Sequence, residues 1–196
     1  MEQNNFIKIS VDTLGSETSI ENIIKGLNKS FLRNDNYYFR LFGPVDKLKK
    51  ALNDYDALKN NIEIVDCSET VGMNDKPSDV MRAKKNSSMY KSIDSISDTD
   101  SQAVLSCGNT GALMALSLLN IKTLDSIKRP AIASVWPNIS SESIVLDLGA
   151  NIKASSQYLV DNAILGASLA TTLLKIEYPS VGLLNVGKEE NKGNEI

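Results

Sequence analysis

Apolar and polar residues alternate at the start of the chain, and the spacing of the apolar residues then lengthens to that of a helix. Ile7, Ile9 and Val11 occupy every second position, which is typical of a β-strand. After a turn at Gly15, apolar residues recur three or four positions apart behind a helix cap at Ser19. These residues are Ile20, Ile23, Ile24, Leu27 and Phe31. The pattern predicts a strand over residues 6–12 and then a helix.

The same succession of strand and helix continues through most of the chain. The further predicted strands span residues 37–42, 62–65, 103–106, 131–136, 143–147 and 181–186. The further predicted helices begin at Pro44, at about Ser78, at Thr110 and at Gln157. Such alternation implies a largely parallel sheet covered by helices on both faces. We therefore expect one α/β domain over residues 1–196, without an internal repeat or a linker.

Composition limits the chemistry that this chain performs. Of its 196 residues, 42% are hydrophobic and 23% are charged, as in ordinary soluble domains. A net charge of −3 argues against general nucleic-acid binding. The polar first residues and the lack of a long apolar run predict a cytoplasmic protein. The chain has no histidine and only two cysteines, which excludes a histidine-based triad and a cysteine zinc site, and we expect neither metal nor cofactor.

Four predicted strands end in the same way, with a polar residue followed by a glycine. In parallel sheets, ligands bind outside the carboxyl ends of the strands, where glycines let the backbone approach the ligand. A single turn of this kind is ordinary connection chemistry, whereas four on one edge predict a shared cleft. The pairs are Asp12 with Gly15, Ser106 with Gly108, Asp147 with Gly149, and Asn185 with Gly187.

The segment from Ser106 to Gly111 is the strongest candidate for anion binding. Gly108 and Gly111 flank Asn109 and Thr110 where a strand leads into a helix. Free N–H groups at the helix start, together with the two polar side chains, would form a phosphate cradle. The alternative is that Asn109 or Thr110 only caps the helix. The two flanking glycines favour anion binding, so we expect both side chains to face phosphate.

Five blocks of the sequence together resemble one enzyme family. The blocks are RAKKNSSM at residues 82–89, SCGNTGA at 106–112, RPA at 129–131, LDLGAN at 146–151 and NVGKEENKGN at 185–194. In order and spacing they resemble the PlsX-type phosphate acyltransferases of bacterial phospholipid synthesis. The resemblance runs from the first strand to the last residue. It implies a three-layer Rossmann-like sandwich, similar to phosphate acetyltransferases and isopropylmalate dehydrogenases.

The resemblance also implies a reaction and its partners. Enzymes of this family convert acyl-acyl-carrier protein and inorganic phosphate into acyl phosphate and free carrier protein. They work as homodimers that associate loosely with the membrane. Phosphate is already anionic near neutral pH, so it needs positioning more than a strong base, which suits a chain without histidine. The thioester carbonyl needs donors where its oxygen becomes negative.

The resemblance assigns roles to residues of this chain. Lys192 matches a family lysine implicated in catalysis, and Asn194 belongs to the same block. Residues expected to bind phosphate, or the acidic carrier protein, are Lys84, Lys85, Ser87 and Ser88. Asp147 and Asn151 are expected to shape the cleft, and Asp12 lies at the end of the first strand beside it. Without the resemblance, a lysine pair is most often a solvated helix face.

Two departures from the family pattern leave alternatives open. The family usually has Gly-Gly-Asp after the first strand, where this chain has Gly15, Ser16 and Glu17, and a serine would hinder a positive φ. Family members also continue considerably beyond residue 196, so we expect a C-terminal part of the fold to be missing. One alternative is an inactive remnant that binds a partner or nothing. Another is a phosphate acetyl- or butyryltransferase acting on coenzyme A thioesters.

Overall fold

The protein is described by a computed structural model that covers residues 6–98, 100–139, 141–148 and 154–184. The chain divides into two compact units, Met1–Lys122 and Thr123–Ile196. The expectation of a single domain over residues 1–196 stays a prediction. No helix in the described ranges is long and apolar enough to span a membrane.

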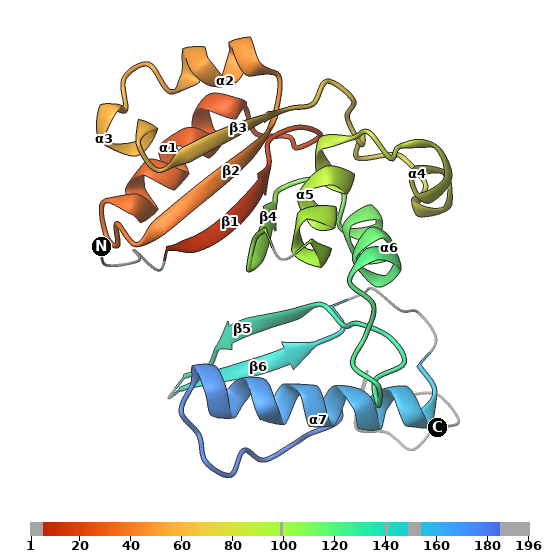
Figure 1. Ribbon diagram of the computed structural model, residues 1–196. Coiled ribbons are helices and arrows are strands. Elements are labelled where there is room, and N and C mark those ends of the chain that lie inside the picture. Colours follow the sequence, from red (N-terminus) through yellow and green to blue (C-terminus); the bar gives the residue numbers. More distant parts are fainter. Residues whose placement is uncertain (1–5, 99, 140, 149–153, 185–196) are drawn as a thin grey trace. The chain divides into compact units, whose positions relative to one another are not determined.

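The first unit contains a parallel sheet of four strands (Figure 1). The strands are β1 (Ile7–Asp12), β2 (Tyr37–Gly43), β3 (Ile62–Asp66) and β4 (Ala103–Ser106), and their order across the sheet is β3-β2-β1-β4. Every pairing in this sheet is parallel. In the register of β1 with β4, Asp12 lies opposite Ser106 at the carboxyl edge. The predicted α/β class with a mostly parallel sheet is confirmed.

One face of this sheet packs against helices through an apolar core. The helices α1 (Ile20–Phe31), α2 (Val45–Ala51) and α3 (Asp56–Lys59) pack there (Figure 1). Their apolar residues meet alternate positions of the strands, because successive side chains of a strand point to opposite faces. The buried residues of this core are Val11, Ile23, Ile24, Leu27, Phe31, Phe39, Leu41, Leu48, Leu52 and Leu58. The predicted helix cap at Ser19 is confirmed, since its side chain accepts a hydrogen bond from the Asn22 amide.

The opposite face of β1 is polar. Helix α5 (Ser88–Ser97) packs against β1, β2 and β4 through a row of buried serines. The Ser10 hydroxyl lies 2.6 Å from the Ser95 hydroxyl and 2.8 Å from that of Ser101. One face of the sheet therefore contacts hydrocarbon and the other contacts hydroxyl groups, and helices cover both faces.

A second apolar cluster joins α5 to two further helices, α4 (Pro77–Ala83) and α6 (Thr110–Asn120). Its buried residues are Val71, Val80, Met89, Ile93, Ala112 and Leu116. The sequence predicted one helix from about Ser78, but the structure has two, because α4 ends at Ala83 and Ser87 caps a new helix. The cluster fixes the start of α6 beside the start of α5.

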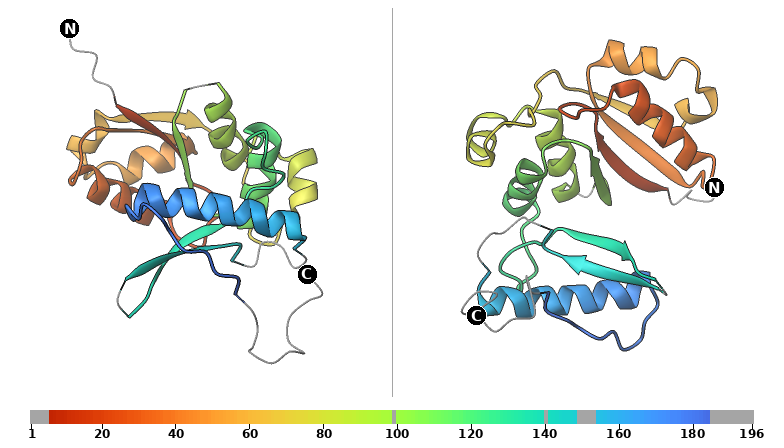
Figure 2. Two further views of the ribbon diagram at one scale, coloured as in Figure 1. Left: turned by 90° about the horizontal axis from the view of Figure 1, so that it is seen from below. Right: turned by 180° about the vertical axis from the view of Figure 1, so that it is seen from behind.

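The second unit contains an antiparallel strand pair and a long helix. Strands β5 (Ala133–Pro137) and β6 (Glu142–Leu146) pair with each other, and α7 (Ser156–Leu173) packs along β6 (Figures 1 and 2). The predicted strand over residues 181–186 is not found in its described part, because residues 181–184 adopt no regular structure. Alternating apolar residues alone do not make a strand, whose amides and carbonyls need a neighbouring strand.

Candidate functional site

A buried carboxylate connects three elements at the carboxyl edge of the parallel sheet. Asp12, the last residue of β1, is 2% exposed. Its Oδ1 accepts hydrogen bonds from the Ser88 hydroxyl (2.5 Å) and the Leu14 amide (3.3 Å), and its Oδ2 accepts one from the Ser106 hydroxyl (2.8 Å). Asp12 therefore ties the end of β1 to the end of β4 and to the start of α5.

We expect replacement of Asp12 by asparagine to change the pH dependence of stability. Burial raises the pKa of the Asp12 carboxyl above 3.8, against the opposing effect of the Ser88, Ser106 and Leu14 bonds. The folded state thus binds the proton more tightly than the unfolded state. Wild type should lose stability relative to Asp12→Asn as pH rises from 3.8 through the raised folded pKa, and should keep this disadvantage above it.

Urea unfolding of both proteins between about pH 4 and pH 7 measures this difference. Carboxyls whose pKa is lowered, such as those of Asp56 and Asp75, are common to both proteins and largely cancel. Free energies of unfolding that run parallel over the whole range would contradict the prediction.

The turn after β4 approaches this carboxylate closely. The Ser106 hydroxyl accepts a hydrogen bond from the Gly108 amide (3.1 Å) while it donates to Asp12. A Cβ at Gly108 would lie 2.9 Å from Cε of Met89 and 3.6 Å from Oδ2 of Asp12. The turn therefore lies against Asp12 and Met89.

Asn109 is the N-cap of α6, one of the two roles that its sequence position allows. Its Oδ1 accepts a hydrogen bond from the Ala112 amide at 3.0 Å. Its Nδ2 lies within 3.0–3.2 Å of three carbonyl oxygens, those of Gly72, Met73 and Asp75. One side chain thus fixes the start of α6 to the loop before α4, and its contact with phosphate stays a prediction.

Two backbone amides at the start of α6 remain available to a ligand. Gly108 and Ala112 donate their amide protons to Ser106 and Asn109. Among the described residues, none accepts a hydrogen bond from the amides of Thr110 or Gly111, and both residues are exposed. Together with the hydroxyl of the exposed Thr110, they make up a group of donors, which we call the Thr110 donor group.

The lysine and serine residues of the 82–89 block have different surroundings. Lys84 Nζ donates to Asp75 Oδ2 (2.5 Å) and to the Thr70 carbonyl (2.8 Å). These bonds join the end of α4 to the loop that precedes this helix. Lys85 is exposed. Ser87 is buried and caps α5 through the Tyr90 amide. Ser88 is buried and bonded to Asp12, so three of the four expected ligands, Lys84, Ser87 and Ser88, already make internal contacts.

The remaining predicted site residues lie in the second unit or outside the described residues. Asp147 follows β6 in the second unit, with φ 58°, and its amide donates to the Ile132 carbonyl at 2.8 Å. Asn151, Lys192 and Asn194 lie outside the described residues, as do Gly149, Asn185 and Gly187. Of the four strand ends expected to share a cleft, those of β1 and β4 are adjacent.

The first loop, which connects β1 to α1, contacts the loop before α4, which follows β3. Gly15 has φ +75°, and a Cβ there would lie 2.0 Å from the Val71 carbonyl oxygen. Within the described ranges, Ser16 is not among the residues with positive φ, and its hydroxyl donates to the Thr18 carbonyl at 2.8 Å. The serine at position 16 therefore fits this loop without the strain that the sequence suggested.

Sequence reasoning missed Asp75 and the contact of Ser88 with Asp12. Serines at positions 88, 92 and 95 share one face of α5, and this spacing could have indicated a polar interface.

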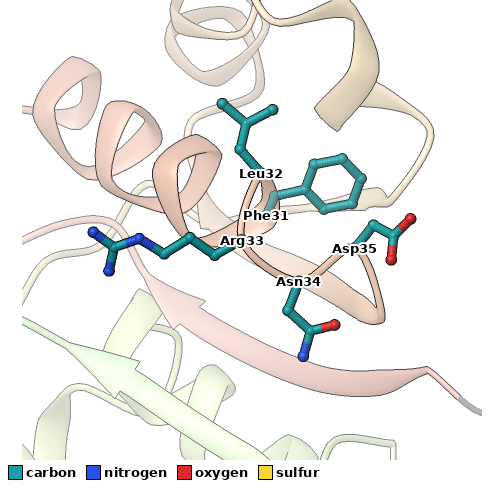
Figure 3. Close-up of a pocket in the computed structure, with 5 residues that line it drawn as sticks. All are labelled: Phe31, Leu32, Arg33, Asn34 and Asp35. Carbon is teal, nitrogen blue, oxygen red and sulfur yellow. The ribbon is translucent and has the colours of Figure 1, made fainter.

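A pocket lies elsewhere, at the turn after α1, and is lined by Phe31, Leu32, Arg33, Asn34 and Asp35 (Figure 3). This turn leads into the amino end of β2, away from the carboxyl edge, so the pocket is not part of the site. No group of three potential metal ligands occurs in the described part of the chain.

Comparison with known proteins identifies relatives of this chain. Residues 7–196 match the family described as "Fatty acid synthesis protein". The chain belongs to this family. Proteins named phosphate acyltransferase are 43% identical in Sinorhizobium fredii and 44% identical in Rhizobium meliloti, over 96% of this chain and 55% of each relative. A third, from Chelativorans sp., is 45% identical over 96% of this chain and 54% of its own length.

These relatives confirm the resemblance to the phosphate acyltransferases, and this chain spans about half of their length. A solved structure, the EutD phosphotransacetylase from Staphylococcus aureus, has a similar fold. Its TM-score is 0.61 at 18% identity, and the match covers 86% of this chain and 54% of that protein. This likeness bears out the predicted fold class.

Proposed function

We propose that this chain is part of a phosphate acyltransferase that forms acyl phosphate from acyl-acyl-carrier protein and inorganic phosphate, in phospholipid synthesis. The observation that carries the proposal is the 43–45% identity, over 96% of the chain, to proteins named phosphate acyltransferase. Cytoplasmic location, a homodimer and loose membrane association belong to the same proposal. So does contact of Lys85, and of Lys84 after release from Asp75, with the acidic carrier protein.

The reaction needs no histidine. A phosphate oxygen attacks the thioester carbonyl carbon, the carbon–sulfur bond breaks, and the carrier thiol leaves with a proton from phosphate. The Thr110 donor group offers two amides and a hydroxyl to the phosphate oxygens, and amides at a helix start favour an anion. We propose that Lys192 holds phosphate or stabilises the oxyanion, that Asn194, two residues later, acts with it, and that Asp147 and Asn151 shape the cleft.

We expect inorganic phosphate to bind at the Thr110 donor group. Titrated into the ¹⁵N-labelled chain, phosphate should shift the amide resonances of Thr110 and Gly111 most. The amides of Gly108 and Ala112 are matched controls, because their protons are already donated to Ser106 and Asn109. Chloride at equal ionic strength should leave all four resonances nearly unchanged. Phosphate-induced shifts confined to other residues would exclude this site.

Acyl transfer itself is tested with the whole length that the relatives have. β4 is an edge of the sheet in the described structure, and Leu105 on it is 41% exposed. Unpaired edges and exposed apolar residues favour association. We expect the chain alone to self-associate in light scattering and to form acyl phosphate near background, and the downstream half of the Rhizobium meliloti relative to restore both solubility and activity.

The same assay separates the alternatives. Turnover of acetyl- or butyryl-coenzyme A, but not of acyl-carrier protein, would replace the proposal by a phosphate acetyl- or butyryltransferase. No turnover of either thioester by the restored assembly would favour an inactive remnant. Robust turnover by a monodisperse 196-residue chain would contradict the need for a second half.

A further inference from the structure

A relay of two hydrogen bonds runs from a buried carboxylate to the turn that carries the Thr110 donor group. Asp12 Oδ2 accepts the Ser106 hydroxyl proton at 2.8 Å, and Ser106 Oγ accepts the Gly108 amide proton at 3.1 Å. A hydroxyl has one proton to donate. Because Asp12 accepts this proton, the Ser106 O–H points at Asp12, and a lone pair of Ser106 Oγ is directed at the Gly108 amide. We propose that Asp12 is a positioning residue that fixes the Gly108 turn through Ser106, and so aims the Thr110 donor group at phosphate.

The geometry favours positioning over direct contact with a substrate. Asp12 is 2% exposed, and both of its carboxylate oxygens already accept hydrogen bonds from the protein. A second anion beside this carboxylate would be repelled. Thr110 and Gly111, two and three residues beyond the relay, are exposed and have amides without an acceptor in the described ranges.

Gly108 lies next to the relay. A Cβ at residue 108 would lie 3.4 Å from Ser106 Oγ and 3.6 Å from Asp12 Oδ2, so the backbone rests directly on the relay. From the other side, Asn109 binds the loop before α4 through three carbonyl oxygens. The start of α6 is thus held from two directions, and Asp12 supplies one of them.

Amide hydrogen exchange at Gly108 tests the relay in the 196-residue chain. Asp12→Ala and Ser106→Ala should each speed exchange of this amide by about tenfold, the usual worth of one hydrogen bond. Since both act through one path, the double variant should also show about tenfold rather than about a hundredfold. Ser106→Thr, which keeps the hydroxyl, should restore slow exchange. If Asp12→Ala does not fold, the Gly108 exchange rates of Ser106→Ala and Ser106→Thr still show whether the Ser106 hydroxyl protects this amide.

Ser10→Ala is the matched control. Ser10 lies two residues earlier on the same face of β1, and its buried hydroxyl bonds to Ser95 and Ser101 rather than to the Gly108 turn. This variant should lose stability without faster exchange at Gly108. Equal acceleration at Gly108 in Ser10→Ala and Ser106→Ala would show general loosening and overturn the relay, as would a fully additive double variant.

Phosphate affinity supplies the functional readout, and this part rests on the proposed function. The dissociation constant of inorganic phosphate should rise about tenfold in Ser106→Ala and stay unchanged in Ser10→Ala and Ser106→Thr. Unchanged affinity in a variant with faster Gly108 exchange would overturn the positioning role. Wild type that binds no phosphate would instead contradict the proposed function, and the exchange rates would still accept or reject the relay.

Discussion

Replacing Lys192 by alanine is expected to lower acyl phosphate formation by on the order of a hundredfold or more, with little loss of stability. This prediction rests on the proposed role of Lys192, which matches a family lysine implicated in catalysis. A cation there would stabilise charge that develops on phosphate or on the thioester oxygen. Such stabilisation is usually the largest single contribution to catalysis. Turnover is measured with the chain and the downstream half of a relative together.

The matched control is Lys188→Ala, four residues earlier in the same block. It removes an equal charge from the same segment and should reduce turnover far less. Equal rates for wild type and Lys192→Ala would remove the catalytic role. A loss shared equally by both variants would indicate general electrostatic attraction of the acidic carrier protein rather than a specific catalytic contact.

Gly15→Ala is expected to destabilise the protein by about 2–4 kcal/mol. The backbone at Gly15 has φ +75°, which alanine adopts only under strain. The new methyl group would also lie 2.0 Å from the Val71 carbonyl oxygen, and Val71 is a buried member of the second apolar cluster. The first loop or the loop before α4 must therefore move. The free energy of unfolding in urea measures the loss.

Gly26→Ala provides the control for this prediction. Gly26 lies inside α1, is exposed, and a Cβ there would meet nothing within 4 Å. Alanine in a helix interior is favoured over glycine, so this variant should gain up to about 1 kcal/mol. Similar unfolding midpoints for the two alanine variants would mean that the close approach of Gly15 to Val71 does not exist in solution.

The sequence predicted the elements of the parallel sheet well, because local patterns determine them. The alternation at Ile9 and Val11 follows from packing of one face of β1 against the apolar core, whereas Ile7, at the start of the strand, is 41% exposed. Direction and pairing depend on distant residues, so the antiparallel pairing of β5 with β6 was not predicted. At residues 181–184 the sequence predicted a strand that the structure does not have, although the apolar pattern is present.

The sequence predicted that the ends of β1 and β4 lie on one edge, but not the contacts of each side chain. Glycine turns indicated the carboxyl edge, and the ends of β1 and β4 do meet there. Asn109 and Ser88 were expected to face a ligand, but their hydrogen bonds are made to Ala112 and the loop before α4, and to Asp12. A short polar side chain beside a helix start satisfies the backbone or an anion equally well, and only the surrounding contacts distinguish the two.

The serine-lined contact between α5 and β1 allows the interior to reorganise without moving its heavy atoms. A hydroxyl proton rotates about its C–O bond while the oxygen stays in place, so each serine can exchange donor and acceptor roles. Ser88 and Ser106 donate to Asp12, and Ser10, Ser95 and Ser101 form a second group of linked hydroxyls on the same interface. If Asp12 takes up a proton, its own O–H can donate to a serine oxygen after one rotation. An apolar interface has no such hydroxyl groups. The serine-lined face of the sheet can therefore accommodate a change of buried charge that would disrupt the apolar face toward α1, α2 and α3.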